Sequence, residues 1–338
     1  MKSEVISEVD FPRRTWLKGV GGSLLLALSG EMPAYSKTTA TRARLSPAEF
    51  KQQLKGPVLS VPTCFTQGLE VDYQGFRNII EQAKPAGIGI FALTAGNNQY
   101  DVLTREEIQK ITVALIETAE KDAITIAAAG DWGLEDVCQY AQFADRLGAT
   151  ALQVMKPAGA DDDAALEFFR KVAARTRLPV VLHGEFSESL LERLTAIPSI
   201  AALKEDVGPA YFINVQRKFG DRLAIFEGGP EYIYLIGYPY GAPASYATLG
   251  TFVPQITARF WGALEQDDLR EAYRIVQKYE HPFFDRWSHG FWRASLEHFG
   301  IAQRHLRPPQ RTLAAADMQS VSDFYQKLGF KVHTDHDY

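Results

Sequence analysis

The chain has 338 residues and a formal net charge of −5, with 46% hydrophobic and 23% charged residues. This balance is that of a globular protein and excludes a disordered chain or a coiled coil. Two cysteines exclude a disulfide scaffold and a cysteine-rich zinc site. The acidic charge, with no basic stripe, argues against nucleic acid as a partner. No uninterrupted apolar run reaches the roughly 18 residues of a transmembrane helix, so we expect no stable membrane insertion.

The first 36 residues are interpreted as an export signal. Arg13 and Arg14 form a twin-arginine pair, a short apolar run follows at 19–30, and residues 34–36 (Ala-Tyr-Ser) provide small residues for cleavage. This order resembles a twin-arginine signal, and the alternative is a basic N-terminus with a weak amphipathic helix. We expect a protein that is exported folded, to the periplasm or beyond, with residues 37–54 as a linker leading into the fold.

Short apolar runs alternate with helical patterns from residue 55 onward. The clearest helix is predicted at 104–121, where Thr104 and Glu107 have the spacing of a capping box. The runs are almost continuously apolar, as strands buried on both faces should be. The eight runs lie at residues 57–63, 88–94, 123–130, 151–157, 179–184, 200–206, 223–229 and 242–250.

Eight strand–helix units over residues 55–265 predict an α/β fold, a (β/α)8 TIM barrel. A doubly wound sheet is the competing fold, but no G-x-G-x-x-G follows the first strand. Residues 266–330 are expected to form a C-terminal helical extension, with the aromatic stretch 281–292 packed on the barrel and at a subunit interface. The tail at 331–338 is expected to be frayed rather than to bind metal.

Catalytic residues of such barrels stand at the C-terminal ends of the strands, and Lys204 ends the sixth run. A lysine there is partly desolvated, which favours the free amine that attacks ketones and forms a Schiff base. The alternative is a lysine that extends to solvent and pairs with Glu205 or Asp206, and the residues alone leave both readings open. The other candidates at strand ends are Thr63, Gly96, Asn97, Lys156, His183, Glu227, Gly228 and Tyr246.

Several stretches in this order resemble the dihydrodipicolinate synthase / N-acetylneuraminate lyase family. They are VPTCFTQGLEVDYQGFRNII (61–80), GNNQYDVLTREE (96–107), ADRLGATALQVMKP (144–157), LPVVLHG (178–184) and ALKEDVG (202–208). GDRLAIFEGGPE (220–231) and RPP (307–309) look most like the 5-dehydro-4-deoxyglucarate dehydratase branch. The resemblance implies a barrel enzyme that binds 2-keto acids as Schiff bases on the lysine of strand six, which is Lys204 here.

The chain departs from the family pattern at three places. His183 stands where the family has a tyrosine that relays protons; a neutral imidazole could do this work, and a buried core histidine is the alternative. Gly96 and Asn97 replace the threonine pair that holds the carboxylate, and Gln99 stands where a glutamate is common. The GEFSES segment after strand five has no arginine, which argues against lysine-biosynthetic synthase activity.

The remaining candidates have two readings each. Lys156 could hold a distal carboxylate of the substrate, or could be a solvated loop lysine. Thr63 and Tyr246 could hydrogen-bond the substrate, although Tyr246 could instead be barrel packing. Cys64 is expected to be a buried thiol rather than a nucleophile.

We therefore predict a Schiff-base-forming lyase, either an aldolase or a dehydratase, acting on a sugar-derived 2-keto acid. Lys204 and His183 are the predicted catalytic residues, and the other strand-end candidates are assigned to substrate binding. The chemistry needs no metal or organic cofactor. The resemblance implies a homotetramer or homodimer. The alternative is a non-catalytic protein that binds a keto acid or sugar acid on the same barrel.

Overall fold

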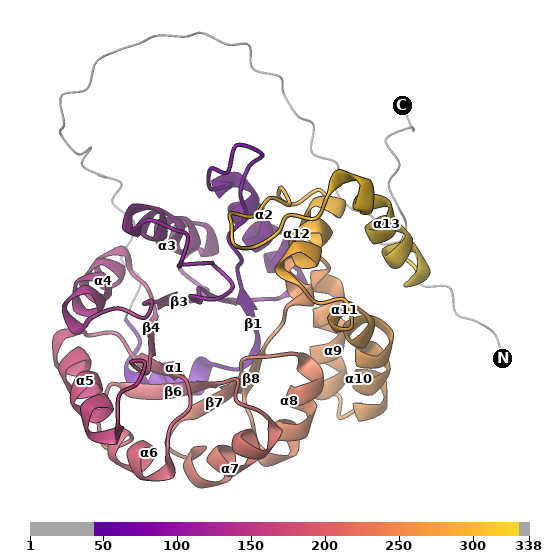
Figure 1. Cartoon of the computed structure of the whole chain (residues 1–338). Coiled ribbons are helices and arrows are strands. Elements are labelled where there is room, and N and C mark those ends of the chain that lie inside the picture. Colours follow the sequence, from indigo (N-terminus) through magenta and orange to yellow (C-terminus); the bar gives the residue numbers. More distant parts are fainter. Residues whose placement is uncertain (1–43, 331–338) are drawn as a thin grey trace, which may run out of the picture. The chain divides into compact units, whose positions relative to one another are not determined.

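The computed structural model describes residues 44–330 of the chain. Its centre is a closed barrel of eight parallel strands in chain order, with helices around it (Figure 1). The barrel closes where β1 pairs in parallel with β8, Val58 lying opposite Tyr246. This confirms the predicted (β/α)8 barrel. The predicted signal at 1–36 and the tail at 331–338 lie outside the described residues.

The strands are shorter than the apolar runs that predicted them, because hydrogen-bonded pairing stops before each run ends. They are β1 Gly56–Ser60, β2 Ile90–Ala92, β3 Ile124–Ala128, β4 Ala151–Met155, β5 Val180–His183, β6 Ile200–Glu205, β7 Ala224–Glu227 and β8 Ala244–Tyr246. The barrel helices are α2 Tyr73–Ala83, α3 Arg105–Ala119, α4 Leu134–Leu147, α5 Asp162–Arg175, α6 Glu188–Leu194, α7 Pro209–Phe219, α8 Glu231–Gly237 and α9 Pro254–Glu265.

The predicted capping box at the start of α3 is confirmed. The Thr104 hydroxyl accepts a hydrogen bond from the Glu107 backbone, and the Glu107 carboxylate accepts one from the Thr104 backbone. Arg307, from the C-terminal part of the chain, pairs with the same carboxylate at 2.7 Å. The start of α3, close to the predicted substrate turn, is therefore fixed both locally and from a distant segment.

Side chains along each strand alternate between two separate cores, because successive residues of a strand point to opposite faces. Inward-facing residues such as Val58, Val181 and Phe226 fill the barrel, whereas Leu59 and Leu203 pack outward against the helices. This alternation decides which strand-end residues can face the barrel mouth.

A short helix, α1 (Pro47–Gln53), lies in the segment predicted as a linker, where no helix was expected. Ser46 and Glu49 form its capping box. Phe50 and Leu54 are fully buried and belong to the core inside the barrel. The helix therefore closes the barrel from one end and contributes to its interior.

The C-terminal helices are α10 Leu269–Ile275, α11 His281–Phe284, α12 His289–His298 and α13 Met318–Lys327. They lie beside α9 and α2 at one side of the barrel (Figure 1). The aromatic stretch packs inward: Phe283 and Trp292 are fully buried, and the Trp292 indole donates to the Thr251 hydroxyl at 2.8 Å. Trp287 remains 39% exposed, and its predicted place at a subunit interface stays a prediction. No helix within residues 44–330 is long and apolar enough to cross a membrane.

Replacing Phe50 by Ala should lower the free energy of unfolding by about 3–5 kcal/mol, because it empties space inside the barrel that no neighbour can refill. Urea unfolding followed by circular dichroism measures this loss. Gln52→Ala, an exposed position in the same helix, is the matched control and should change stability little. Equal effects of the two substitutions would show that α1 does not stabilise the barrel.

Candidate active site

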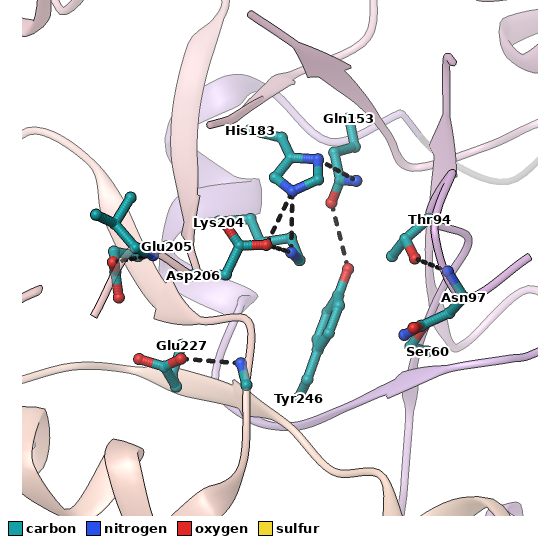
Figure 2. A network of polar contacts seen from close by, with 12 residues as sticks. Ser60, Thr94, Asn97, Gln153, His183, Lys204, Glu205, Asp206, Glu227 and Tyr246 are labelled. Carbon is teal, nitrogen blue, oxygen red and sulfur yellow. Dashed lines mark hydrogen bonds and ion pairs between the residues drawn. The ribbon is translucent and has the colours of Figure 1, made fainter. Parts of the chain in front are cut away.

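Four polar side chains from four strands meet inside the carboxyl end of the barrel. They are Gln153 of β4, His183 of β5, Lys204 of β6 and Tyr246 of β8 (Figure 2). Each lies two residues beyond an inward-facing apolar residue on its strand, so the alternation of the strand turns it inward. An irregularity in the pairing of β5 with β6 adjusts the register and brings His183 directly opposite Lys204.

Lys204 is the centre of this group, and only 5% of its surface is exposed. Its Nζ lies 3.0 Å from His183 Nε2 and forms an ion pair with the Asp206 carboxylate. The ring of Tyr246 lies 5.3 Å from the same nitrogen. A reactive amine is therefore held between an imidazole, a carboxylate and an aromatic face.

A chain of hydrogen bonds sets the tautomer of His183. The Tyr246 hydroxyl donates to Gln153 Oε1 at 3.2 Å, which turns the Gln153 amide nitrogen toward His183 Nδ1 at 3.4 Å. Nδ1 therefore accepts, and Nε2 carries the proton, so Nε2 and the neighbouring Lys204 Nζ are both donors that share Asp206 Oδ2 as their acceptor. That proton points to Asp206 Oδ2, which is 3.1 Å away.

The charges of the group follow from its burial and its contacts. Burial lowers the pKa of His183, so the imidazole is neutral at neutral pH. Burial opposes ionisation of Asp206, but the hydrogen bond from His183 and the charge of Lys204 lower the pKa of this carboxyl well below its usual range. Burial raises the pKa of Tyr246 far above that of a free phenol, so its hydroxyl remains a donor. The site thus contains one carboxylate, one neutral imidazole and one phenol around the amine.

Gly228 forms the wall next to the lysine. A Cβ at this position would lie 2.8 Å from both Cε and Nζ of Lys204. The Gly228 N–H donates to the Glu205 carbonyl at 2.5 Å, which fixes the loop after β7 in this position. A side chain here would collide with the Glu205 backbone carbonyl, also 2.8 Å away, and would displace the end of the lysine, so glycine allows the loop to approach the amine this closely.

The turn after β2 lies across the barrel mouth from Lys204 (Figure 2). Asn97 Nδ2 donates to Ser60 Oγ at 2.9 Å, and the Asn97 backbone N–H donates to Thr94 Oγ1 at 3.3 Å. The backbone N–H groups of Ala95 and Gly96 donate no hydrogen bond within the described part of the chain. These two free donors are suited to a carboxylate.

The side chains of three predicted binding residues, Thr63, Lys156 and Glu227, lie apart from this group. Thr63 is fully buried, and its hydroxyl accepts a hydrogen bond from Asn98 Nδ2 at 3.1 Å, so it supports the turn after β2 rather than facing the mouth. The Lys156 Nζ lies 4.0 Å from Asp162 Oδ1, and only the backbone N–H of Lys156 reaches the Lys204 group, donating to the His183 carbonyl at 2.9 Å.

Glu227 lies on the outward face of β7 opposite Glu205, because Phe226 takes the inward position. Burial, and then the neighbouring charge of Glu205, raise the pKa of Glu227 to about 8. The pair holds a proton at neutral pH, and Glu227 Oε1 accepts from the Gly229 N–H at 2.9 Å. Glu227 therefore fixes the loop after β7 and does not reach the amine.

Two residues around the amine, Asp206 and Gln153, were not predicted as site residues. Asp206 was considered only as a charge partner of a non-catalytic lysine, and the structure shows that pairing together with the contact to His183. Gln153 could have been found, because it is a polar residue inside an otherwise apolar strand. The predicted burial of Cys64 is confirmed, and burial raises the pKa of its thiol to about 12.

The described residues contain no cluster of three or more side chains suited to hold a metal ion. The arrangement itself can bind a carboxylate at the turn after β2, present an amine to a carbonyl and move a proton through Asp206 and His183. These are the requirements of Schiff-base chemistry.

Comparisons with known proteins agree with this chemistry. A model of the dihydrodipicolinate synthetase family matches residues 53–328. A probable 5-dehydro-4-deoxyglucarate dehydratase of Pseudomonas putida (strain W619) is 22% identical over 302 residues, which cover 84% of this chain and 99% of the relative. A protein of the same name from Streptomyces coelicolor is 24% identical over 252 residues, covering 70% of this chain and 78% of that protein.

Solved structures share the fold. Dihydrodipicolinate synthase from Oceanobacillus iheyensis superposes with a TM-score of 0.77 at 18% identity, covering 84% of this chain and all of that one (100%). N-acetylneuraminate lyase from Mycoplasma synoviae gives a TM-score of 0.72 at 14% identity, covering 81% of this chain and 98% of that one. The chain is an enzyme of the dihydrodipicolinate synthetase family, whose members are Schiff-base-forming aldolases or dehydratases that act on keto acids.

Proposed function

We propose that the protein is a dehydratase that binds a sugar-derived 2-keto acid as a Schiff base on Lys204. The observation that carries this proposal is the buried Lys204 amine, which lies between His183 and Asp206 at the carboxyl end of the barrel. The relatives named as probable 5-dehydro-4-deoxyglucarate dehydratases support dehydration and a sugar-acid substrate.

Schiff-base formation begins with loss of a proton from the Lys204 ammonium. Asp206, which is 40% exposed, connects the amine to solvent and carries that proton away. The amine then attacks the keto carbon and forms a carbinolamine. Asp206 returns a proton to the hydroxyl of the carbinolamine, which leaves as water. The product is an iminium whose positive charge draws electrons from the neighbouring carbon.

Dehydration follows by removal of a proton next to the iminium carbon. In the resting hydrogen-bond chain His183 Nε2 is a donor, so Asp206 is the group with a free lone pair. We assign proton removal to Asp206 and orientation of its carboxylate to His183. The electron pair of the broken C–H bond forms the C=C bond of an enamine, and the C=N pair moves to nitrogen. The enamine expels the hydroxyl of the next carbon, which leaves as water with the proton held by Asp206, and hydrolysis of the resulting iminium releases the product and the Lys204 amine.

The substrate carboxylate is assigned to the turn after β2. Asn97 lies across the mouth from the amine (Figure 2), and the free N–H groups of Ala95 and Gly96 belong to the same turn. A 2-keto acid bound there presents its carbonyl toward Lys204. Gly228 leaves room for the tetrahedral carbinolamine beside Nζ.

We also propose that the protein is exported folded through the twin-arginine route and acts as a homo-oligomer. The order of the arginine pair, the apolar run and the small residues within 1–36 supports export. Cell fractionation with and without Arg13→Lys and Arg14→Lys tests it, and retention of both forms in the cytoplasm would contradict it. Sedimentation analysis of the purified protein tests the oligomer.

Incubation with pyruvate and borohydride should attach one adduct to Lys204, because the reductant traps the iminium as a stable secondary amine. Peptide mass mapping locates the adduct. Lys204→Arg keeps the charge but cannot form a Schiff base, and it should abolish both trapping and turnover in a folded protein. An adduct on another lysine, or none across a panel of 2-keto acids, would refute the proposal and favour a non-catalytic binding protein.

Asp206→Asn should lower kcat by roughly 10²–10⁴-fold and should slow trapping on Lys204 without abolishing it, because the proton carrier is lost and the nucleophile remains. Turnover with a sugar-derived keto acid and trapping with pyruvate are measured side by side. Asp163→Asn, an exposed carboxylate, is the control and should leave both unchanged. Full turnover by Asp206→Asn would return the role of base to His183.

A further inference from the structure

Arg293 of α12 is a fully buried cation without a carboxylate partner among the described residues. Its Nε donates to the Thr63 carbonyl at 3.0 Å, and its Nη2 donates to the Asn97 carbonyl at 2.6 Å. Its Nη1 is buried and has no hydrogen-bond partner. Burial of an unpaired charge is costly, so a stable site of this kind implies an anion that the protein meets during function.

The nearby acidic groups are engaged elsewhere. Asp72 accepts a hydrogen bond from the Gly75 N–H and caps α2. Glu297 pairs with Arg304. Within residues 44–330 no carboxylate forms an ion pair with Arg293, and the aromatic ring of Trp292, 4.5 Å from the guanidinium carbon, is its other charge-stabilising contact.

The two carbonyls that Arg293 contacts belong to the segments that build the turn after β2. Thr63 follows β1, and Asn97 is the residue directly after Gly96, whose N–H is free. The guanidinium thus lies behind the turn and holds it from a helix 196 residues further along the chain. A positive charge at this place strengthens the attraction of the free N–H groups for an anion.

We propose that Arg293 is the positioning residue of the carboxylate subsite: it fixes the turn after β2 and supplies the positive charge that selects 2-keto acids over neutral ketones. The proposal rests on the Schiff-base function of Lys204. Arg293 acts through the turn and its charge, and it does not take part in proton transfer. The anion that compensates its charge is the carboxylate of the bound substrate.

Borohydride trapping with pyruvate and with its uncharged methyl ester tests the proposal. In the wild type, pyruvate should reach half-maximal trapping at a concentration at least about tenfold below that of the ester. Arg293→Gln removes the charge and should raise the pyruvate concentration that gives half-maximal trapping roughly tenfold to a hundredfold, while the corresponding concentration of the ester stays unchanged. Arg293→Lys keeps a positive charge and should preserve the preference for pyruvate within about threefold.

A purely structural role of Arg293 would raise the half-maximal trapping concentrations of pyruvate and of the ester together, and that result would overturn the proposal. An unchanged ratio of the two concentrations in a folded Arg293→Gln variant would overturn it as well. If Arg293→Gln does not fold, loss of the preference in folded Arg293→Lys would overturn it as well. Absence of any adduct in the wild type would instead refute the Schiff-base function. Calorimetric binding of pyruvate to the wild type and to Arg293→Lys would then still test the carboxylate subsite, and unmeasurable binding to both would refute it.

Discussion

An ammonium group that is almost completely buried needs a neighbouring negative charge, and the ion pair between Lys204 and Asp206 supplies it. The rest of the site is arranged around this pair. His183 donates to the same carboxylate oxygen, Gln153 fixes the tautomer of His183, and Tyr246 fixes the orientation of Gln153. Each of these side chains comes from a different strand. The pairing of the strands in the closed barrel therefore fixes the positions of the side chains and the direction in which each one donates.

Two buried cations, Lys204 at the mouth and Arg293 behind the turn after β2, differ in what compensates them. Lys204 has an anion within the protein and gives it up only when it reacts with a carbonyl. Arg293 has carbonyl partners but no carboxylate, and its charge is left for the substrate. This difference assigns covalent chemistry to one side of the mouth and recognition of the carboxylate to the other.

The fold was predictable because each strand and helix leaves a local pattern. The strand ends also led to Lys204, His183, Gly228 and Tyr246, all of which the structure brings together. Glu227 lies apart from them, because Phe226 takes the inward position once the neighbouring strands are paired, and a single run does not show which of its residues faces inward.

Other parts of the site depend on contacts between distant segments. Arg293 reaches the turn after β2 from the C-terminal extension, and no spacing along the chain indicates such a contact. The register irregularity between β5 and β6 decides that His183 stands opposite Lys204, and it is a property of two strands together. Helix α1 has only seven residues, too few for a clear period, and its apolar residues are buried only because the barrel end is open to them.

A crystal structure of the protein soaked with pyruvate would show directly whether Lys204 forms a covalent bond with a 2-keto acid. We expect continuous density from Lys204 Nζ to the keto carbon, with the carboxylate at the N–H groups of Ala95 and Gly96 and Asp206 beside the new bond. Pyruvate bound without a covalent link to Lys204, or bound away from the turn after β2, would contradict it.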